Sequence, residues 1–185
     1  MAFSGTTFGF SNSETVYGVW NTTAGGDSIP SSSGTSIGNY YPTEIPSYAC
    51  DNNINSKYTN FGTCTSASSA MTCGVNTGFY VTPQQGPLLV IGLKICTSSN
   101  LSARDPMTIT FEGSNQPASA LHIGSSWTLL YNGSSGLSTD PGRLTCGVSQ
   151  LFNNNSIWYA SYRFLVTSKR GADASTWYSE VIFIT

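Results

Sequence analysis

Charge is what this sequence has least of. Charged residues make up only 9% of its 185 residues, against about 25% in an average soluble protein. Only seven side chains are Lys or Arg, and none of them cluster beyond Lys169 and Arg170. Nucleic-acid binding needs a basic stripe that displaces counterions from phosphates, and a polybasic membrane anchor needs a similar patch. The sequence therefore predicts neither a nucleic-acid partner nor attachment to a membrane surface.

Long apolar runs are also missing, which predicts that no segment inserts into a membrane. Ser, Thr, Asn and Gly supply 84 of the 185 residues. Ser, Thr and Asn compete with the helical backbone for hydrogen bonds, and Gly loses much entropy on ordering, so the mixture disfavours helices. Hydrophobic residues reach 39% and aromatic residues 12%, which is too many for a disordered polar chain. The composition predicts an all-β protein with one core.

Short segments rich in β-formers recur along the chain, and none shows a sustained helical period. Each is bounded by Gly, Pro, Asn or Ser, and segments 107–112 and 127–131 alternate as half-buried antiparallel strands do. We expect a two-sheet sandwich, with an aromatic, Gly/Ser/Thr-rich segment at 1–33 preceding a domain at 34–185. The expected strands are 14–20, 78–82, 88–96, 107–112, 127–131, 162–167 and 178–184.

The five cysteines show no C-x-x-C spacing, and the single histidine, His122, is far from all of them in sequence. A Cys/His zinc site is therefore not expected. One reading is one or two disulfides in an oxidising compartment, with Cys64 and Cys73 closing a short loop and one cysteine left over. The other is buried free thiols. Extracellular secretion is also indicated by four N-glycosylation sequons, at Asn21, Asn100, Asn132 and Asn154.

Oxygen-bearing side chains gather between positions 51 and 58. Asp51, Asn53, Asn55 and Ser56 offer several oxygen ligands within six residues, which is the chemistry that a hard cation such as calcium prefers. The segment is not an EF-hand loop, because it lacks that loop's invariant Gly and closing Glu. The alternative is an Asx-rich turn that satisfies only its own backbone.

The same segment, DNNINSKY, resembles the D-G-N-x-x-T-x-W motif of discoidin (F5/8 type C) domains and family-32-like carbohydrate-binding modules. Four more segments resemble that family in the same order and spacing. They are RDPMTITFEGSN at 104–115, SWTLL at 126–130, YRFLV at 162–166 and SEVIF at 179–183. The resemblance covers about residues 34–184. It implies a galactose-binding-like jelly-roll β-sandwich, here containing disulfides.

The resemblance also implies a structural calcium ion, whose ligands would come from Asp51, Asn53, Ser56 and Glu180. The motif's glycine is replaced by Asn52, a residue type that tolerates a left-handed backbone, and its tryptophan is replaced by Tyr58. We further expect Arg104 and Asp105 to form an ion pair at a strand entrance. Trp127 is expected in the core.

A sugar site needs an exposed aromatic ring for the pyranose face, with amides or a guanidinium for the hydroxyls. Trp158 and Tyr159 follow three asparagines that include Asn154, so one loop offers that combination. For each aromatic residue, the alternative is packing beneath a loop. The other candidates are Trp20 and Trp177, with His122 and Arg143 as polar partners.

Catalysis has little support in the sequence. Residues 34–38 match G-x-S-x-G, but they lack the strand–turn–helix context of a nucleophile elbow, and no close Asp/Glu pair suggests a glycosidase. The leading hypothesis is a secreted, non-catalytic, calcium-stabilised module that binds a glycan or glycoprotein. The alternative is a structural or adhesive subunit of an extracellular fibre, in which residues 1–25 pair with a neighbouring subunit to form a homo-oligomer or filament.

Overall fold

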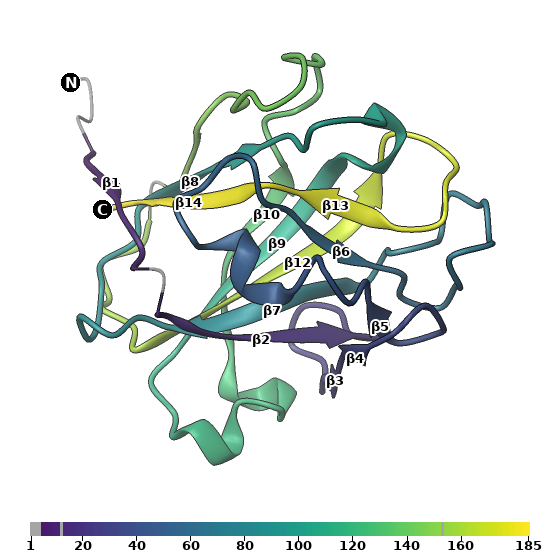
Figure 1. The fold of residues 1–185 in the computed structure, drawn as a ribbon. Helices are drawn as coiled ribbons and strands as arrows, with labels where there is room; N and C mark the ends of the chain where they lie inside the picture. Colours follow the sequence, from purple (N-terminus) through teal and green to yellow (C-terminus); the bar gives the residue numbers. More distant parts are fainter. Residues whose placement is uncertain (1–4, 12, 153) are drawn as a thin grey trace.

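The computed structural model describes residues 5–11, 13–152 and 154–185 of an all-β fold (Figure 1). One layer is a six-stranded sheet with the order β10-β9-β12-β7-β2-β3. Every pairing within it is antiparallel. Its strands are β2 (Thr15–Trp20), β3 (Ile29–Pro30), β7 (Thr77–Thr82), β9 (Pro106–Ser114), β10 (Thr128–Ser134) and β12 (Ser161–Lys169).

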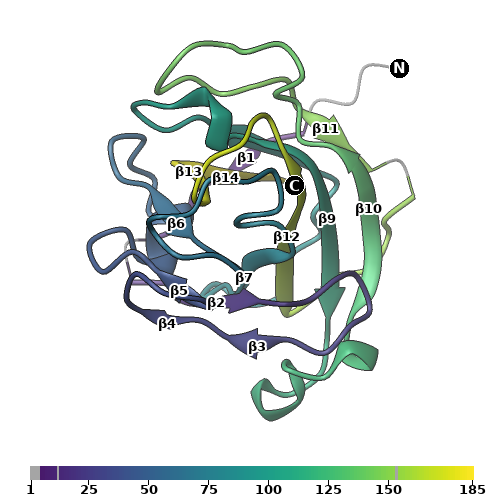
Figure 2. The same cartoon turned by 90° about the vertical axis from the view of Figure 1, so that its right-hand side faces the viewer.

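The second layer consists of two four-stranded sheets that the chain joins at Ser179 (Figure 2). The first has the order β1-β14-β8-β11, with β1 (Thr7–Phe8), β8 (Gly92–Cys96), β11 (Gln150–Leu151) and β14 (Glu180–Ile184). The second has the order β13-β6-β5-β4, with β4 (Ser32–Ser33), β5 (Asn39–Tyr40), β6 (Tyr58–Asn60) and β13 (Thr176–Tyr178). The helical content of the described residues is four short 3-10 turns: η1 (Pro46–Ala49), η2 (Ser102–Arg104), η3 (Ala118–Ala120) and η4 (Gly124–Ser126).

The core lies between the two layers and is rich in aromatic rings. On β12, Phe164 points inward between Phe79 and Phe111, its partners on the neighbouring strands. Phe111 meets Phe183 of β14 edge-on, with ring centroids 5.1 Å apart. Tyr178 of β13 contacts Phe164 in the same way, at 5.3 Å. Both halves of the second layer therefore pack on the same face of the six-stranded sheet.

The opposite face of the six-stranded sheet carries a buried ion pair. Arg163 and Glu112 face each other across β12 and β9, both fully buried, with 2.7 Å between Arg163 Nε and Glu112 Oε2. The Trp127 ring covers them, its centroid 4.9 Å from the guanidinium carbon of Arg163. Trp127 is thus buried, as the sequence predicted. The amide of Gly25 also donates to Glu112, at 2.8 Å, and so ties a distant loop to the pair.

The described part of the N-terminal segment pairs within the chain itself. β1 adds to the edge of β14, and β2 is an inner strand of the six-stranded sheet between β7 and β3. Phe10 is buried and packs edge-on against Phe183, with ring centroids 4.8 Å apart. Phe10 thus belongs to the domain's own core, whereas pairing with a neighbouring subunit stays a prediction.

Most expected strands are present, and two needed correction. The expected strand at 88–96 begins only at Gly92, because the Val90 carbonyl is taken by the Asn155 side chain and Leu88 makes an isolated bridge with Tyr159. The expected strand at 178–184 is two strands. The chain changes sheet at Ser179, whose amide donates to the Cys96 carbonyl at 2.9 Å.

Two disulfides close loops in the structure. Cys64 and Cys73 are bonded as predicted, and Cys96 is bonded to Cys146. Cys50 is the free cysteine of the described residues, and it is buried. Within those same residues, no helix is long and apolar enough to cross a membrane.

Replacing Glu112 tests the contribution of the buried ion pair. We expect Glu112→Ala to lower the free energy of unfolding by about 3–5 kcal/mol, because Arg163 would stay buried without its counter-charge. Chemical denaturation measures this. As the control, Asp140→Ala removes a more exposed carboxylate from Arg143 and should cost about 1 kcal/mol or less. Equal effects of the two substitutions would contradict this account.

Candidate functional site

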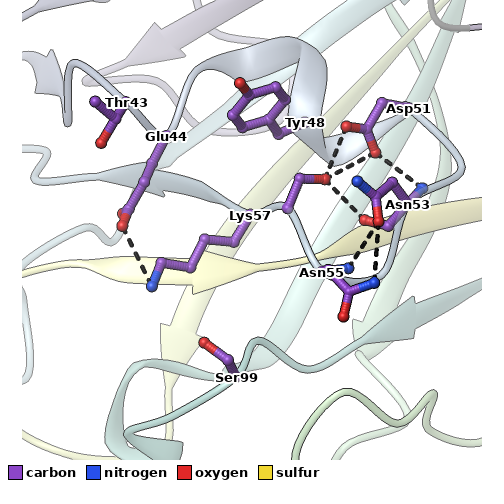
Figure 3. Close-up of a pocket in the computed structure, with 9 residues that line it drawn as sticks. Thr43, Glu44, Tyr48, Asp51, Asn53, Asn55, Lys57 and Ser99 are labelled. Atoms are coloured by element: carbon purple, nitrogen blue, oxygen red, sulfur yellow. Dashed lines mark hydrogen bonds and ion pairs between the residues drawn. The ribbon is translucent and has the colours of Figure 1, made fainter.

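Two adjoining pockets share the carboxylate of Glu44. The larger one is open and polar, with a volume of about 410 Å³ (Figure 3). Its wall combines the loop after η1 with residues near Glu44 and Ser99, which come from separate parts of the chain. The lining residues are Thr43, Glu44, Tyr48, Asp51, Asn53, Asn55, Ser56, Lys57 and Ser99.

The loop after η1 converges on the carboxylate of Asp51. Ser56 Oγ lies 2.9 and 2.7 Å from the two oxygens of Asp51, and 2.7 Å from the Asn53 carbonyl oxygen. A serine hydroxyl has one proton to donate, so three acceptor oxygens surround a single donor. Asn52 holds a left-handed conformation with φ of 58°, as the replacement of the motif's glycine requires. Two backbone amides add donors, from Asn53 to Asp51 Oδ1 at 3.0 Å and from Ser56 to the Asn53 carbonyl at 3.1 Å. The loop therefore brings three oxygen atoms together around the Ser56 hydroxyl.

Glu180, at the start of β14, completes this arrangement. The backbone amide of Asn53 donates both to Asp51 Oδ1, at 3.0 Å, and to Glu180 Oε1, at 2.9 Å, so the two carboxylates lie side by side. Burial, followed by its contact with Asp51, raises the pKa of Glu180 to about 8. Two carboxylates held this close favour either a shared proton or a bound cation.

The donor set fits calcium in chemical type. The structure brings Asp51, Asn53, Ser56 and Glu180 together, although Glu180 is 127 positions from Asn53. They offer two carboxylates, a carbonyl and a hydroxyl, all oxygen ligands. No cluster of three or more His, Cys, Asp or Glu residues that could hold a metal occurs among the described residues. Any cation here would thus rely on neutral oxygens as well as the two carboxylates.

The smaller pocket, of about 280 Å³, is aromatic as well as polar. The Trp177 ring is covered by two cations, with Arg104 and Lys57 at 4.2 and 4.3 Å from its centroid. Trp177 itself is only 4% exposed, so its ring positions the cations and is not open to a ligand. The lining residues are Tyr41, Glu44, Thr59, Phe61, Ser66, Arg104 and Trp177.

Ion pairs fix the charged groups of this pocket. Arg104 Nε lies 2.7 Å from Asp173 Oδ1, and Lys57 Nζ lies 3.2 Å from Glu44 Oε1. The hydroxyl of Thr59 donates to the same Glu44 carboxylate. Beside them Tyr41 is 40% exposed. The pocket thus presents an open aromatic side chain next to a guanidinium and a carboxylate with set positions.

Arg104 and Asp105 were expected to pair with each other, and that prediction is wrong. Asp105 instead accepts two hydrogen bonds from Arg143, at 2.8 and 2.7 Å, while Arg104 turns to Asp173. The two side chains leave η2 in different directions, because Asp105 is fully buried and Arg104 lies near the surface. Arg143 is held in this ion pair and lines neither pocket.

The remaining predicted ligand residues lie outside both pockets. His122 is exposed on the loop between β9 and β10, where its carbonyl accepts from the Ser28 amide at 2.9 Å. Trp158 is exposed, whereas Tyr159 is buried against Tyr162 in the core. The sequons at Asn21, Asn100, Asn132 and Asn154 all have exposed asparagines, and their glycosylation stays a prediction.

Sequence reasoning missed Tyr41 and Glu44. Each stands in an ordinary loop, and only the pairing of β5 with β6 brings Tyr41 beside Thr59, whose carbonyl accepts from the Tyr41 amide at 3.3 Å. The one local signal was the aromatic pair Tyr40–Tyr41 ahead of a proline. Trp177 was identified from the sequence, but its role differs from the expected stacking on a sugar.

No family model and no curated protein matches the sequence. Among solved structures, CBM32-3 from a family 31 glycoside hydrolase of Clostridium perfringens has a TM-score of 0.56 at 13% identity, with 76% of this chain and 82% of that chain covered. The family 32 module of C. perfringens NanJ, in complex with galactose, has a TM-score of 0.53 at 12% identity over 78% and 88%. Chitosan-binding module 1 of a Paenibacillus sp. IK-5 chitosanase/glucanase has 0.52 at 13% over 92% and 93%.

The fold is therefore the galactose-binding-like, discoidin-type β-sandwich of these carbohydrate-binding modules. That confirms the fold class that the resemblance implied. The low identities mean that the similarity concerns the fold, whereas the ligand has to be inferred from the site.

The Asp51–Glu180 pair predicts that, in the presence of a chelator, the domain becomes less stable as the pH rises from 5 to 8. The folded-state pKa of Glu180, about 8, lies above its ordinary value of 4.5. The folded state thus holds a proton that the unfolded chain releases, and its stabilising effect is complete below pH 4.5 and lost as the pH rises through 8. Denaturation in EDTA at pH 5 and pH 8 should show lower stability at pH 8.

Glu180→Gln, neutral at both pH values, should remove most of this difference, while Glu44→Gln should leave it in place. Stability that stays constant or rises between pH 5 and pH 8 in EDTA would contradict the assignment.

Proposed function

We propose that this domain is a non-catalytic glycan-binding module and that its sugar site is the pocket between Tyr41, Glu44 and Arg104. The observation that carries the proposal is an exposed tyrosine beside an arginine and a carboxylate in one concave site. Aromatic rings stack on the C–H face of a pyranose, and planar charged groups bond to its hydroxyls. The hydroxyls of Thr59 and Ser66 line the same pocket and add further hydrogen-bonding groups.

The fixed geometry of these groups favours binding. Arg104 is held against the Trp177 ring and by Asp173, and Glu44 is held by Lys57 and Thr59. Side chains that are ordered before the ligand arrives lose little entropy on binding. A weakly binding, hydroxyl-rich ligand benefits from such preorganisation, because each hydrogen bond to a sugar replaces one to water.

The fold supports the proposal by analogy. The three solved structures compared above are carbohydrate-binding modules, one of them in complex with galactose and another named for chitosan. A fold hosts several functions, so this analogy adds to the argument from the pocket and does not replace it. Ser36, in the G-x-S-x-G match, lies between β4 and β5, and that loop leads into a strand and not into a helix.

We further propose that calcium stabilises the domain at Asp51, Asn53, Ser56 and Glu180. No Lys or Arg forms a salt bridge with Asp51 or Glu180 among the described residues. A cation would neutralise this pair and tie the loop after η1 to β14. Lys57 follows that loop directly and pairs with Glu44, so the ion would also hold one wall of the sugar pocket in place.

An extracellular location is part of the proposal. Two disulfides close loops in the fold, and such bonds form and persist in oxidising compartments. The four exposed sequon asparagines agree with secretion and await a test by mass spectrometry.

A glycan array tests the sugar site. The folded protein should bind a defined set of glycans, and Tyr41→Ala or Arg104→Ala should each weaken binding to that set at least about tenfold, equivalent to 1.4 kcal/mol. Tyr17→Ala is the matched control, since Tyr17 is 53% exposed but lies on the six-stranded sheet outside the pocket. The proposal fails if wild type binds no glycan, or if both pocket variants bind like wild type.

Thermal unfolding tests the calcium site. Calcium at one hundred times its Kd should stabilise the domain by about 2.7 kcal/mol, which raises the Tm by roughly 5–10 °C for a domain of this size. Asp51→Asn should abolish the difference between calcium and EDTA, whereas Asp140→Asn should preserve it. An identical melting curve of the wild type in calcium and in EDTA would refute the site.

A further inference from the structure

A third pocket lies at the far end of β9 from Arg104. It has a volume of about 190 Å³ and opens between the first residues of β10 (128–130) and the loop at 154–157. Arg104 precedes the first residue of β9, whereas Leu129 of β10 is paired with Glu112 near its last. A strand of nine residues at about 3.3 Å per residue separates this pocket from the pocket that contains Arg104 by roughly 25 Å.

Trp158 lies in the chain between Ile157 and Tyr159, which both line this pocket, and 59% of its surface is exposed. The backbone around it is pinned on both sides. Asn115 donates to the Trp158 carbonyl at 3.0 Å and accepts from the Ala160 amide at 2.8 Å, while Tyr159 and Leu88 exchange two backbone hydrogen bonds. A rigid backbone thus presents a large aromatic ring to solvent. The other three tryptophans are at least half-buried, so this exposure is particular to Trp158.

The loop beside Trp158 is equally well held. Asn155 donates to the Val90 carbonyl at 2.8 Å and accepts from the Ile157 amide at 3.1 Å. Leu129 and Ile157, each about half exposed, form apolar walls of the pocket. Asn154, Ser156 and Thr128 add an amide and two hydroxyls. The pocket therefore offers apolar walls and neutral hydrogen-bonding groups, and the exposed ring of Trp158 follows directly after one of its lining residues.

No charge lies on the segments that build this surface. Residues 113–139 and 144–162 contain no Asp, Glu, Lys or Arg. The pocket proposed above as the sugar site, in contrast, contains Glu44 and Arg104, with Lys57 beside it. A surface without charge offers nothing to attract an acidic sugar or a charged peptide, whereas amides and hydroxyls bond readily to the hydroxyls of a neutral one.

We propose that the Trp158 surface (Trp158 with the 128–130 and 154–157 pocket) is a second glycan-binding site, specific for an uncharged sugar. The inference rests on the proposed function only in that both ligands are glycans, since no residue is shared between the two sites. The indole stacks on the sugar face, and the neutral groups of the pocket receive its hydroxyls. A domain with two sites about 25 Å apart holds two glycan chains, or two parts of one chain, with the avidity of linked binding.

The test compares four proteins on one array of neutral and acidic glycans: wild type, Trp158→Ala, Arg104→Ala and the double variant. Protein made without N-glycans is used, because Asn154 is a sequon residue at the site. We expect Trp158→Ala to lose at least tenfold on a subset of neutral glycans while keeping the glycans that depend on Arg104. The double variant should bind neither set, and Trp158→Tyr should restore part of the neutral signal.

If wild type binds no glycan, both sites fail. If wild type binds but Trp158→Ala binds every glycan like wild type, only the second site is overturned. If Arg104→Ala binds every glycan like wild type while Trp158→Ala loses binding, the first site fails and the second stands. A sizing column covers self-association: a wild-type oligomer that Trp158→Ala turns into a monomer, with glycan binding unchanged, would make this surface a contact between copies. Tyr17→Ala controls for loss of an exposed aromatic residue.

Discussion

The position of β12 between β7 and β9 is the constraint on which the rest of the structure depends. Successive side chains of a strand point to opposite faces, so Phe164 enters the aromatic core while Arg163 meets Glu112 on the other face. A shift of one residue would put a guanidinium into the core and a phenyl ring against Glu112. Both faces of the strand thus fix the same register. That register sets where the chain enters β9 after Arg104 and where it enters β12 after the loop at 154–157. Each proposed sugar site takes part of its wall from one of these two places.

Charged side chains are scarce, and most of them are held in ion pairs. Five of the seven Lys and Arg side chains form salt bridges with carboxylates, mostly where distant segments meet. Asp51 and Glu180 stand apart, because they face each other and no salt bridge reaches either of them within the described part of the chain. A calcium ion would neutralise this pair, as salt bridges neutralise five of the seven other Asp and Glu side chains. The calcium proposal and the sugar proposal are connected through Lys57 and Glu44.

Local sequence patterns predicted much of this structure. Segments rich in β-formers and bounded by Gly, Pro, Asn or Ser identified most strands, two of them also by period-two alternation. The short spacing of Cys64 and Cys73 indicated their disulfide, and the oxygen-rich segment at 51–58 led to the loop that meets Glu180. The pocket proposed as the sugar site could not be predicted in this way. Tyr41, Arg104 and Trp177 are far apart in the sequence, and only the sheet order brings them together. Burial likewise separates Trp158, which is open to solvent, from Tyr159, which is in the core.

An amide NMR titration of the isotope-labelled domain with the glycan selected on the array tests the central claim most directly. In calcium-containing buffer, the account predicts saturable shifts in the pocket between Tyr41, Glu44 and Arg104. The shifted residues should be those that line this pocket or lie next to it, at 41–44, 59–66, 101–104 and 177. Shifts that are absent at millimolar glycan, or that avoid these residues, would contradict the assignment of this pocket as the sugar site.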